Sequence, residues 1–327
     1  MTQTATRPAA HYREVDADSS GQRLDNFLLG ALSGVPRSHI YRLIRSGQVR
    51  VNSGRVRAGY RLKSGDRVRI PPVRRPRPGT DRVSSNRVRW LGERILYEDR
   101  SIVVLNKPAG MPVHAGSGVD YGCIEALRSV SPRLRTADLV HRLDRGTSGC
   151  LLVAKRRAAL RQLHALLRTG GMDKRYLALV RGRWPDSRSI VDARLSRRRR
   201  GGESVVRVSP GGKHACSRFR VVRRFADTAT LVEVAIDTGR THQIRVHAAH
   251  AGHPLAGDRQ YGNESFNATL SAMGLRRMFL HAHSLRFSWP GTEKPFAVSS
   301  PLPAELGVML DSLESAASVR AGPDRVP

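Results

Sequence analysis

The sequence predicts an α+β protein of two domains, the larger of which contains a mixed, mostly antiparallel sheet. The chain has 327 residues, a length that suits about two domains with a sizeable core. Apolar stretches of strand type outnumber those of helix type, and the two kinds do not alternate regularly. A doubly wound fold would require regular alternation, so the α+β class is favoured.

The first domain is expected at residues 21–72, after a polar stretch, 1–20, that lacks periodicity and is expected to be a flexible tail. Two segments have apolar residues at helical spacing, and two have the alternation of strands. Gly47 is expected to end the second helix. The four predicted elements are Leu24 to Leu32, Ile40 to Ile44, Val49 to Asn52 and Val68 to Ile70.

A linker rich in proline and arginine is expected at residues 73–88, and prolines favour an extended chain there. The larger domain is expected at 89–312, and residues 313–327 lose periodicity and are expected to be frayed. Arg197 to Arg200 is expected to be an exposed loop. The predicted strands are Ile95 to Leu105, Cys150 to Ala154, Tyr176 to Arg181 and Leu231 to Ile236, and the predicted helix is Ala158 to Leu167.

The charge of the chain indicates a polyanionic partner. There are 57 Lys and Arg residues against 27 Asp and Glu, a formal net charge of +30. Nucleic acid is favoured over membrane, because no apolar run approaches the roughly 18–20 residues of a spanning helix. The N-terminus lacks the apolar core of a signal peptide. The three cysteines lack C-x-x-C spacing, which favours reduced thiols, a cytoplasmic location and no zinc site.

The nine residues His141 to Gly149 are the most informative stretch of the chain. They place one carboxylate, Asp144, between Arg142 and Arg145, on a short loop that leads into an apolar strand. Adjacent positive charge keeps such an acid ionised, and an ionised acid in a basic cleft suits attack on an anionic substrate. Taken alone, an R-x-D-R sequence more often forms an ion pair that braces a loop.

The full stretch resembles the catalytic signature of the RluA-type pseudouridine synthases. Four further blocks resemble that family in the same order along the chain. They are Leu105 to His114, Lys174 to Val180, Thr238 to His247, and Gly252 to Pro254 with Tyr261-Gly262. The resemblance implies an α+β catalytic domain whose large central sheet is split by an active-site cleft. It also implies a reaction that needs no metal, redox cofactor or nucleotide.

The resemblance also implies roles for individual residues. Asp144 would act on the sugar or on the base, and Arg245 would pair with it from early in a helix that Thr241 could cap. Tyr176 would stack on uracil and help remove a proton from carbon. Arg142 would fill the space left by a flipped base, and Leu143, beside it in the flipping segment, is more typical of packing.

The helix–helix–strand order of residues 21–72, with Arg45 to Asn52 as its signature, resembles the S4 RNA-binding domain. By that resemblance Arg37, Arg42 and Arg45 would contact RNA phosphates. A solvated basic face is the alternative. The crowded histidines, among them His242, His247 and the His281–His283 pair, are expected to form structural hydrogen bonds, since the motifs of a metal site are absent from the sequence.

Stretches outside the catalytic blocks resemble family members that act on the large ribosomal subunit, which implies uridines of 23S rRNA as the substrate and a monomer as the active form. They include Gly34 to Arg42 and Val205 to Ser209. Two alternatives stay open. One is a non-catalytic RNA-binding or ribosome-assembly protein, and the other is the same chemistry on tRNA or on other rRNA sites.

Overall fold

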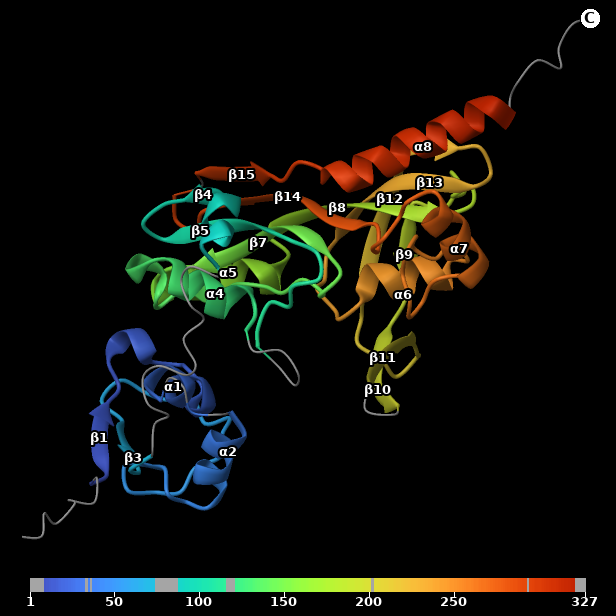
Figure 1. Cartoon of the computed structure of the whole chain (residues 1–327). Helices are drawn as coiled ribbons and strands as arrows, with labels where there is room; N and C mark the ends of the chain where they lie inside the picture. Colours follow the sequence, from blue (N-terminus) through green and yellow to red (C-terminus); the bar gives the residue numbers. More distant parts are fainter. Residues whose placement is uncertain are drawn as a thin grey trace, which may run out of the picture. The chain divides into compact units, whose positions relative to one another are not determined.

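The structure is a computed structural model that describes residues 9–32, 35, 37–73, 88–115, 121–200, 203–292 and 294–320. The chain divides into two compact units, residues 1–84 and 85–327 (Figure 1). Nearly all of the predicted linker, 73–88, and the last seven residues lie outside the described part.

The smaller unit contains two helices on a three-stranded antiparallel sheet of order β1-β3-β2. Buried side chains from both helices and from the strands, such as Leu28, Ile40 and Val68, form a core of their own. Gly47 follows the second helix at φ +70, as predicted. The elements are β1 (His11–Glu14), α1 (Leu24–Ala31), α2 (Arg37–Arg45), β2 (Arg50–Val51) and β3 (Arg67–Ile70), with a 3-10 turn, η1, at Ala17–Ser19.

The tail predicted at residues 1–20 is in part a strand. Residues 1–8 lie outside the described part, but β1 pairs with β3 in antiparallel register from His11–Ile70 to Glu14–Arg67. All four strand side chains are exposed, so they carry no apolar alternation that could have revealed the strand. The backbone pairing and the buried Val15 fix this segment instead.

The larger unit is built on a ten-stranded sheet of order β4-β5-β7-β14-β8-β13-β12-β9, with β15 beside β14 and β6 beside β7. All its pairings are antiparallel except that of β7 with β14, so the predicted α+β class with a mixed sheet is confirmed. The strands are β4 (Ile95–Glu98), β5 (Ile102–Lys107), β6 (Asp138–Leu139), β7 (Ser148–Ala154), β8 (Met172–Arg181), β9 (Ile190–Asp192), β12 (Cys216–Phe225), β13 (Ala229–Ile236), β14 (Leu280–Ser288) and β15 (Pro295–Ser299).

Helices cover this sheet and enclose two separate apolar cores. One core lies between α5 and the half of the sheet that contains β5 and β7, and the other lies between α7, α8 and the half that contains β12 and β13. The parallel pair β7–β14 joins the two halves (Figure 1). The helices are α4 (Cys123–Val130), α5 (Arg157–Thr169), α6 (Gln243–His250), α7 (Glu264–Ala272) and α8 (Ala304–Arg320), with 3-10 turns η2 (Arg89–Arg94) and η3 (Pro132–Leu134).

The strand predicted from Ile95 to Leu105 is instead a hairpin of β4 and β5. Asp99 causes the break, because its carboxylate accepts hydrogen bonds from the backbone N–H groups of Ser101 and Ile102 at 2.6 and 2.8 Å. A side chain that binds the backbone two or three residues ahead makes a turn and competes with an extended strand.

The loop predicted at Arg197 to Arg200 is also wrong. These residues belong to β10 (Leu195–Arg200), which pairs with β11 (Glu203–Val208) in a two-stranded sheet separate from the main one. Figure 1 shows this hairpin extending away from the sheet beside α6. Leu195 and Val206 anchor its base in a small apolar cluster with Val246 of α6.

The fraying predicted after residue 312 is wrong as well, because α8 continues to Arg320. Its apolar anchors end at Leu313, where the sequence periodicity ends. Beyond that point Glu314 pairs with Arg223 of β12, and serine hydroxyls bond carbonyl groups four residues back. Such contacts extend a helix without adding an apolar pattern.

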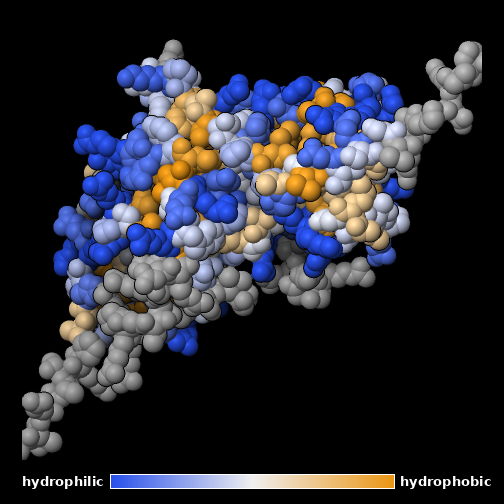
Figure 2. Space-filling model, turned by 45° about the horizontal axis from the view of Figure 1, so that its top comes forward, coloured by the Kyte–Doolittle hydropathy of each residue, from blue (hydrophilic) through white to orange (hydrophobic). Residues whose placement is uncertain are grey.

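On the face shown in Figure 2, apolar side chains form separate patches between charged and polar ones. Among the described residues, no helix has both the length and the apolar character that crossing a membrane requires.

Candidate active site

Asp144 lies on the loop between β6 and β7, and backbone contacts hold this loop against the segment that follows β5. Gly110 N–H donates to the Arg145 carbonyl at 2.8 Å, and the Arg145 side chain donates to the Gly110 carbonyl, also at 2.8 Å. At the start of the loop, Leu152 N–H donates to His141 Nε2 at 3.0 Å. Burial lowers the pKa of His141 to about 4, so it stays neutral in this role.

Lys107 holds the same two segments together through hydrogen bonds. Its side chain is fully buried, and Nζ donates to the carbonyl oxygens of Met111, Pro108 and Arg145 at 2.7, 2.9 and 3.3 Å. Burial lowers the pKa of this ammonium group to about 8. One side chain therefore joins the end of β5 to the residue that follows Asp144.

The exit of the loop is fixed by close packing of backbone on backbone. Gly149 has φ +107, and a Cβ atom at this position would overlap the carbonyl oxygen of Ala282 in β14. Its neighbour Ser148 bonds His281 Nδ1 at 2.9 Å and accepts from Arg277 at 2.7 Å. The glycine thus permits the parallel pairing of β7 with β14 directly beside the loop.

Tyr176 lies in β8, paired with Ala282 of β14, which in turn pairs with Gly149. The side chain is buried, with 6% exposed. Burial, with the nearby negative charge of Asp144, raises the pKa of the phenol. The phenol is therefore neutral at neutral pH.

Arg245 of α6 faces two carboxylates. Its Nη1 lies 3.5 Å from Asp144 Oδ2, so the structure brings together the two residues that the resemblance pairs. It also binds Asp258 in a two-point contact of 2.7 and 2.8 Å. Asp258 is fully buried and further accepts from the backbone N–H groups of Gln260 and Tyr261. The tighter of the two ion pairs is thus one that sequence reasoning missed.

The cap expected from Thr241 is wrong. Helix α6 begins at Gln243, and His242 occupies the N-cap position with a left-handed backbone of φ 54 and ψ 22 and no side-chain cap. This places His242 Nε2 3.9 Å from Asp144 Oδ1 and Nδ1 2.9 Å from the hydroxyl of Tyr261. The Tyr261 ring lies under the Arg245 guanidinium, 4.9 Å from ring centre to Cζ.

Arg142 is exposed and Leu143 is 4% exposed, so the leucine packs into the interior. In the smaller unit Arg42 and Arg45 are exposed on α2, while the side chain of Arg37 lies outside the described part. Other crowded histidines make structural hydrogen bonds: His247 to Ser217 and the Ala193 carbonyl, and His281 to Ser148 and the Ser300 carbonyl.

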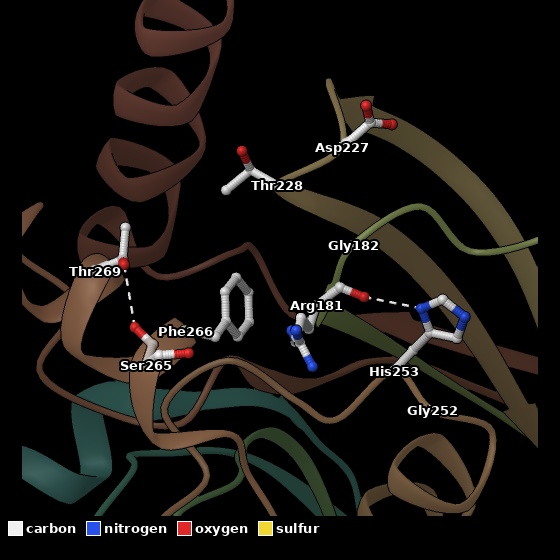
Figure 3. A pocket seen from close by; sticks show the side chains of 9 residues that line it. All are labelled: Arg181, Gly182, Asp227, Thr228, Gly252, His253, Ser265, Phe266 and Thr269. Atoms are coloured by element: carbon white, nitrogen blue, oxygen red, sulfur yellow. Dashed lines mark hydrogen bonds between the residues drawn. The ribbon is translucent and has the colours of Figure 1, made fainter.

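A separate open pocket of about 470 Å³ lies where β8, α6 and α7 meet (Figure 3). Its lining includes Arg181, His253 and Phe266, and none of the predicted catalytic residues contributes to it. His253 Nδ1 bonds the Arg181 carbonyl at 2.9 Å, so this polar group is already engaged within the fold.

Asp258, His242 and Tyr261 are the site residues that sequence reasoning missed. Tyr261-Gly262 resembles the family without an expected role, and His242 is expected only to form structural hydrogen bonds. Only the folded chain shows that all three converge on Arg245 or Asp144.

Comparison with known proteins gives consistent matches over nearly the whole chain. Residues 101–250 match the family model described as RNA pseudouridylate synthase, and residues 22–68 match the S4 domain. The chain is 49% identical to ribosomal large subunit pseudouridine synthase C of Yersinia pestis, covering 96% of this chain and 98% of that protein. The protein of the same name from Escherichia coli is also 49% identical, with 94% and 98% covered.

Two solved structures are similar in fold. Human RNA pseudouridylate synthase domain containing 4 has a TM-score of 0.58 and 27% identity, covering 70% of this chain and 96% of that one. Human RNA pseudouridylate synthase domain containing 1 has a TM-score of 0.54 and 29% identity, with 71% and 96% covered.

Proposed function

This chain belongs to the RNA pseudouridylate synthase family, and on that premise we propose that it isomerises uridines of 23S ribosomal RNA to pseudouridine with Asp144 as its catalytic carboxylate. The observation that carries the assignment is the position of Asp144, partly exposed at 17% and 3.5 Å from Arg245. The names of the relatives from Yersinia pestis and Escherichia coli support the large-subunit substrate.

The reaction requires the target base to leave its stack, because a stacked uridine hides both its C6 and the sugar C1′ from a side chain. Arg142 is exposed beside Asp144, and a planar guanidinium is suited to fill the space that the base vacates. Leu143 is buried and supports this segment by packing.

The isomerisation breaks the bond between N1 and C1′, turns the uracil, and forms a bond between C5 and C1′. C5 loses a proton and N1 gains one, so no oxidant, reductant or group donor is consumed. Asp144 would attack either C1′ or C6, and both routes suit a carboxylate that an arginine orients. Tyr176, on the strand paired with β14 beside the Asp144 loop, would stack on the flipped uracil and help remove the proton from C5.

The S4 domain would hold the RNA through its basic surface. Arg42 and Arg45 are exposed one helical turn apart on α2, at a spacing that lets both face one nucleic-acid strand. Arg37 is assigned the same role from its place at the start of α2.

Carbodiimide-based mapping of pseudouridine in unmodified 23S rRNA and tRNA tests this function. Both RNAs are incubated with wild-type protein and with Asp144→Asn, and RNA binding is measured for each protein. New stops in 23S rRNA with the wild type alone are expected, with binding by both proteins. An active Asp144→Asn protein would overturn the catalytic assignment.

The pattern of stops also separates the alternatives. Stops confined to tRNA would retain the chemistry and replace the substrate. If wild type binds rRNA, and neither free rRNA nor precursor particles of the large subunit acquire stops, the chain acts as a binding or assembly protein and the proposal is wrong.

A further inference from the structure

His242 has a left-handed backbone at the start of α6. Its φ of 54 lies in the left-handed region, which residues other than glycine adopt uncommonly. It occupies the N-cap of α6 without making a side-chain cap, so helix capping does not account for it. Such a conformation at a site suggests that the surrounding structure holds the side chain where it is needed.

The imidazole lies between two groups. Nδ1 is 2.9 Å from the hydroxyl oxygen of Tyr261, and Nε2 is 3.9 Å from Asp144 Oδ1. Arg245 faces the other carboxylate oxygen, Oδ2, at 3.5 Å. Each oxygen of Asp144 is therefore faced by a different nitrogen-bearing side chain.

The hydrogen bonds of Tyr261 favour one tautomer of the imidazole. The backbone N–H of Val206 donates to the Tyr261 hydroxyl oxygen at 2.9 Å, which uses that oxygen as an acceptor. The hydroxyl proton is then free to be donated to His242 Nδ1. A neutral imidazole that accepts at Nδ1 carries its hydrogen on Nε2, the nitrogen that faces Asp144.

The surroundings of His242 favour this neutral form, chiefly through burial. Burial lowers its pKa, and Arg245 and Arg142 act in the same direction, whereas Asp144 and Asp258 oppose them. A neutral N–H donor orients a carboxylate without adding a second full positive charge. A second cation would stabilise the carboxylate before reaction and so weaken it as a nucleophile.

We propose that His242 is a positioning residue for Asp144, held by Tyr261 as the Nε2–H tautomer so that it donates to Oδ1 while Arg245 contacts Oδ2. This inference rests on the proposed role of Asp144. The 3.9 Å separation exceeds a hydrogen bond, and catalytic contacts of this kind commonly tighten when substrate binds.

The first test removes one oxygen atom. Tyr261→Phe keeps the ring beneath Arg245 and deletes the hydroxyl that fixes the imidazole, together with its contact to the Val206 N–H of β11. The single-turnover rate of pseudouridine formation should fall on the order of tenfold, as for the loss of one hydrogen bond to a charged group, while the Kd for RNA stays within about twofold. Tyr97→Phe, which deletes an exposed hydroxyl distant in sequence from the site, is the control and should keep the wild-type rate.

The second test compares two replacements of His242. In His242→Gln the amide nitrogen reaches about as far as Nε2, whereas in His242→Asn it reaches only as far as Nδ1. Asparagine, however, suits the left-handed backbone and the N-cap better. We expect the Gln variant to retain more activity and the Asn variant to be at least as heat-stable. A structural role at the helix start alone would give the reverse order of activity.

The tautomer can be read directly from ¹⁵N chemical shifts in protein labelled with ¹⁵N-histidine, with His242 assigned by its loss in His242→Asn. Nδ1 should give an unprotonated signal and Nε2 a protonated one. A protonated Nδ1, or wild-type rates in both Tyr261→Phe and His242→Asn, would overturn the inference even if Asp144→Asn is inactive. An active Asp144→Asn would instead overturn the proposed function on which it rests.

Discussion

Arg245 contacts two carboxylates that differ in exposure. Asp258 is fully buried and takes the two-point contact, while Asp144 is partly exposed and lies 3.5 Å away. The buried pair fixes the guanidinium, and the remaining nitrogen faces the proposed nucleophile. An arginine held in this way presents its charge to Asp144 in one orientation.

Replacing Asp258 with Asn should therefore lower both the stability of the protein and its catalytic rate, although Asp258 itself is not expected to contact the reacting atoms. The change leaves Arg245 with only the longer contact to Asp144, and breaking a buried ion pair typically costs about 3–5 kcal/mol. Urea unfolding of the variant should show a loss of this size, together with a lower rate of pseudouridine formation. Asp138→Asn, which breaks the exposed pair with Arg128, is the matched control and should change stability by less than about 1 kcal/mol.

The Arg245–Asp258 pair also gives stability a dependence on acid. Burial alone would raise the pKa of Asp258, but hydrogen bonds and the charge of Arg245 outweigh it and lower that pKa. The contribution of this group is present above its unfolded pKa and is lost as the pH falls through the lower folded value. In Asp258→Asn, acid unfolding monitored by circular dichroism should show a smaller loss of stability below about pH 4. If the variant lost as much stability at acid pH as the wild type, this account would be contradicted.

Lys107 should limit activity at alkaline pH. Above its pKa of about 8 the neutral amine has two hydrogens and cannot donate to three carbonyl groups. The contact to Arg145, the longest of the three, supports the catalytic loop. We expect the single-turnover rate to decline as the pH rises through about 8, and Lys107→Met to be slower throughout without this decline.

Stability should change in the opposite direction over the same range. The unfolded lysine, with its ordinary pKa of 10.5, binds a proton more tightly than the folded one, so this group makes folding more favourable as the pH rises from about 8 to 10.5. A fall in activity caused by alkaline unfolding would show both quantities falling together.

For single residues, the sequence could predict which residues belong to the site but not the distances and contacts between them. Asp144, Arg245 and Tyr176 were assigned from blocks that resemble a family, and the structure brings the first two within 3.5 Å. Asp258 is not part of any of these blocks. Its pairing with Arg245 becomes visible only in the folded chain, where the two side chains lie next to each other. Its partner lies 13 residues away, at the other end of a helix and a turn.

At the scale of elements, the parallel pairing of β7 with β14, which joins the two halves of the sheet, requires a glycine at position 149. Its φ of +107 is unfavourable for any side chain, and a Cβ would overlap the Ala282 carbonyl oxygen of β14. Gly149→Ala should therefore lose roughly 2–4 kcal/mol, from backbone strain and overpacking together. Gly170→Ala is a matched control, since Gly170 has φ +74 with open space around it, and should lose only about 1 kcal/mol. Equal losses in urea unfolding would mean that the close approach of β7 and β14 contributes nothing.

The segments with the clearest apolar pattern were predicted well, whereas the buried strand β14 and the helices α4 and α7 were not predicted. Strands β7, β8 and β13 end at the predicted residues and begin two to four residues earlier than predicted, and helix α5 extends its predicted segment by one residue at its start and two at its end. The β1 strand, the β10 strand of arginines and the end of α8 were missed. In β10 the side chains of Arg197 and Arg198 are charged on both faces, so the backbone pairing with β11 leaves no alternation to detect.

At the scale of the molecule, the formal charge of +30 should govern RNA affinity. Each phosphate contact releases counterions, so a handful of contacts should weaken binding on the order of a hundredfold from low to moderate salt. Replacing both Arg42 and Arg45 with Gln should reduce the slope of log Kd against log salt by about 1–2. Arg223→Gln is the control, because Arg223 already pairs with Glu314, and its slope should match the wild type. An unchanged slope in the double variant would remove α2 from the RNA-binding surface.

The central position of β7 determines which partner must deform when enzyme and substrate meet. The loop that carries Asp144 leads into a strand with neighbours on both sides, so it can move far only if the sheet itself opens. We therefore expect the RNA, and not this loop, to undergo the larger change of conformation on binding. Uridines that unstack with little work, in loops or beside mismatches, should then react faster than identical uridines in a continuous duplex, and local RNA stability becomes an element of target choice.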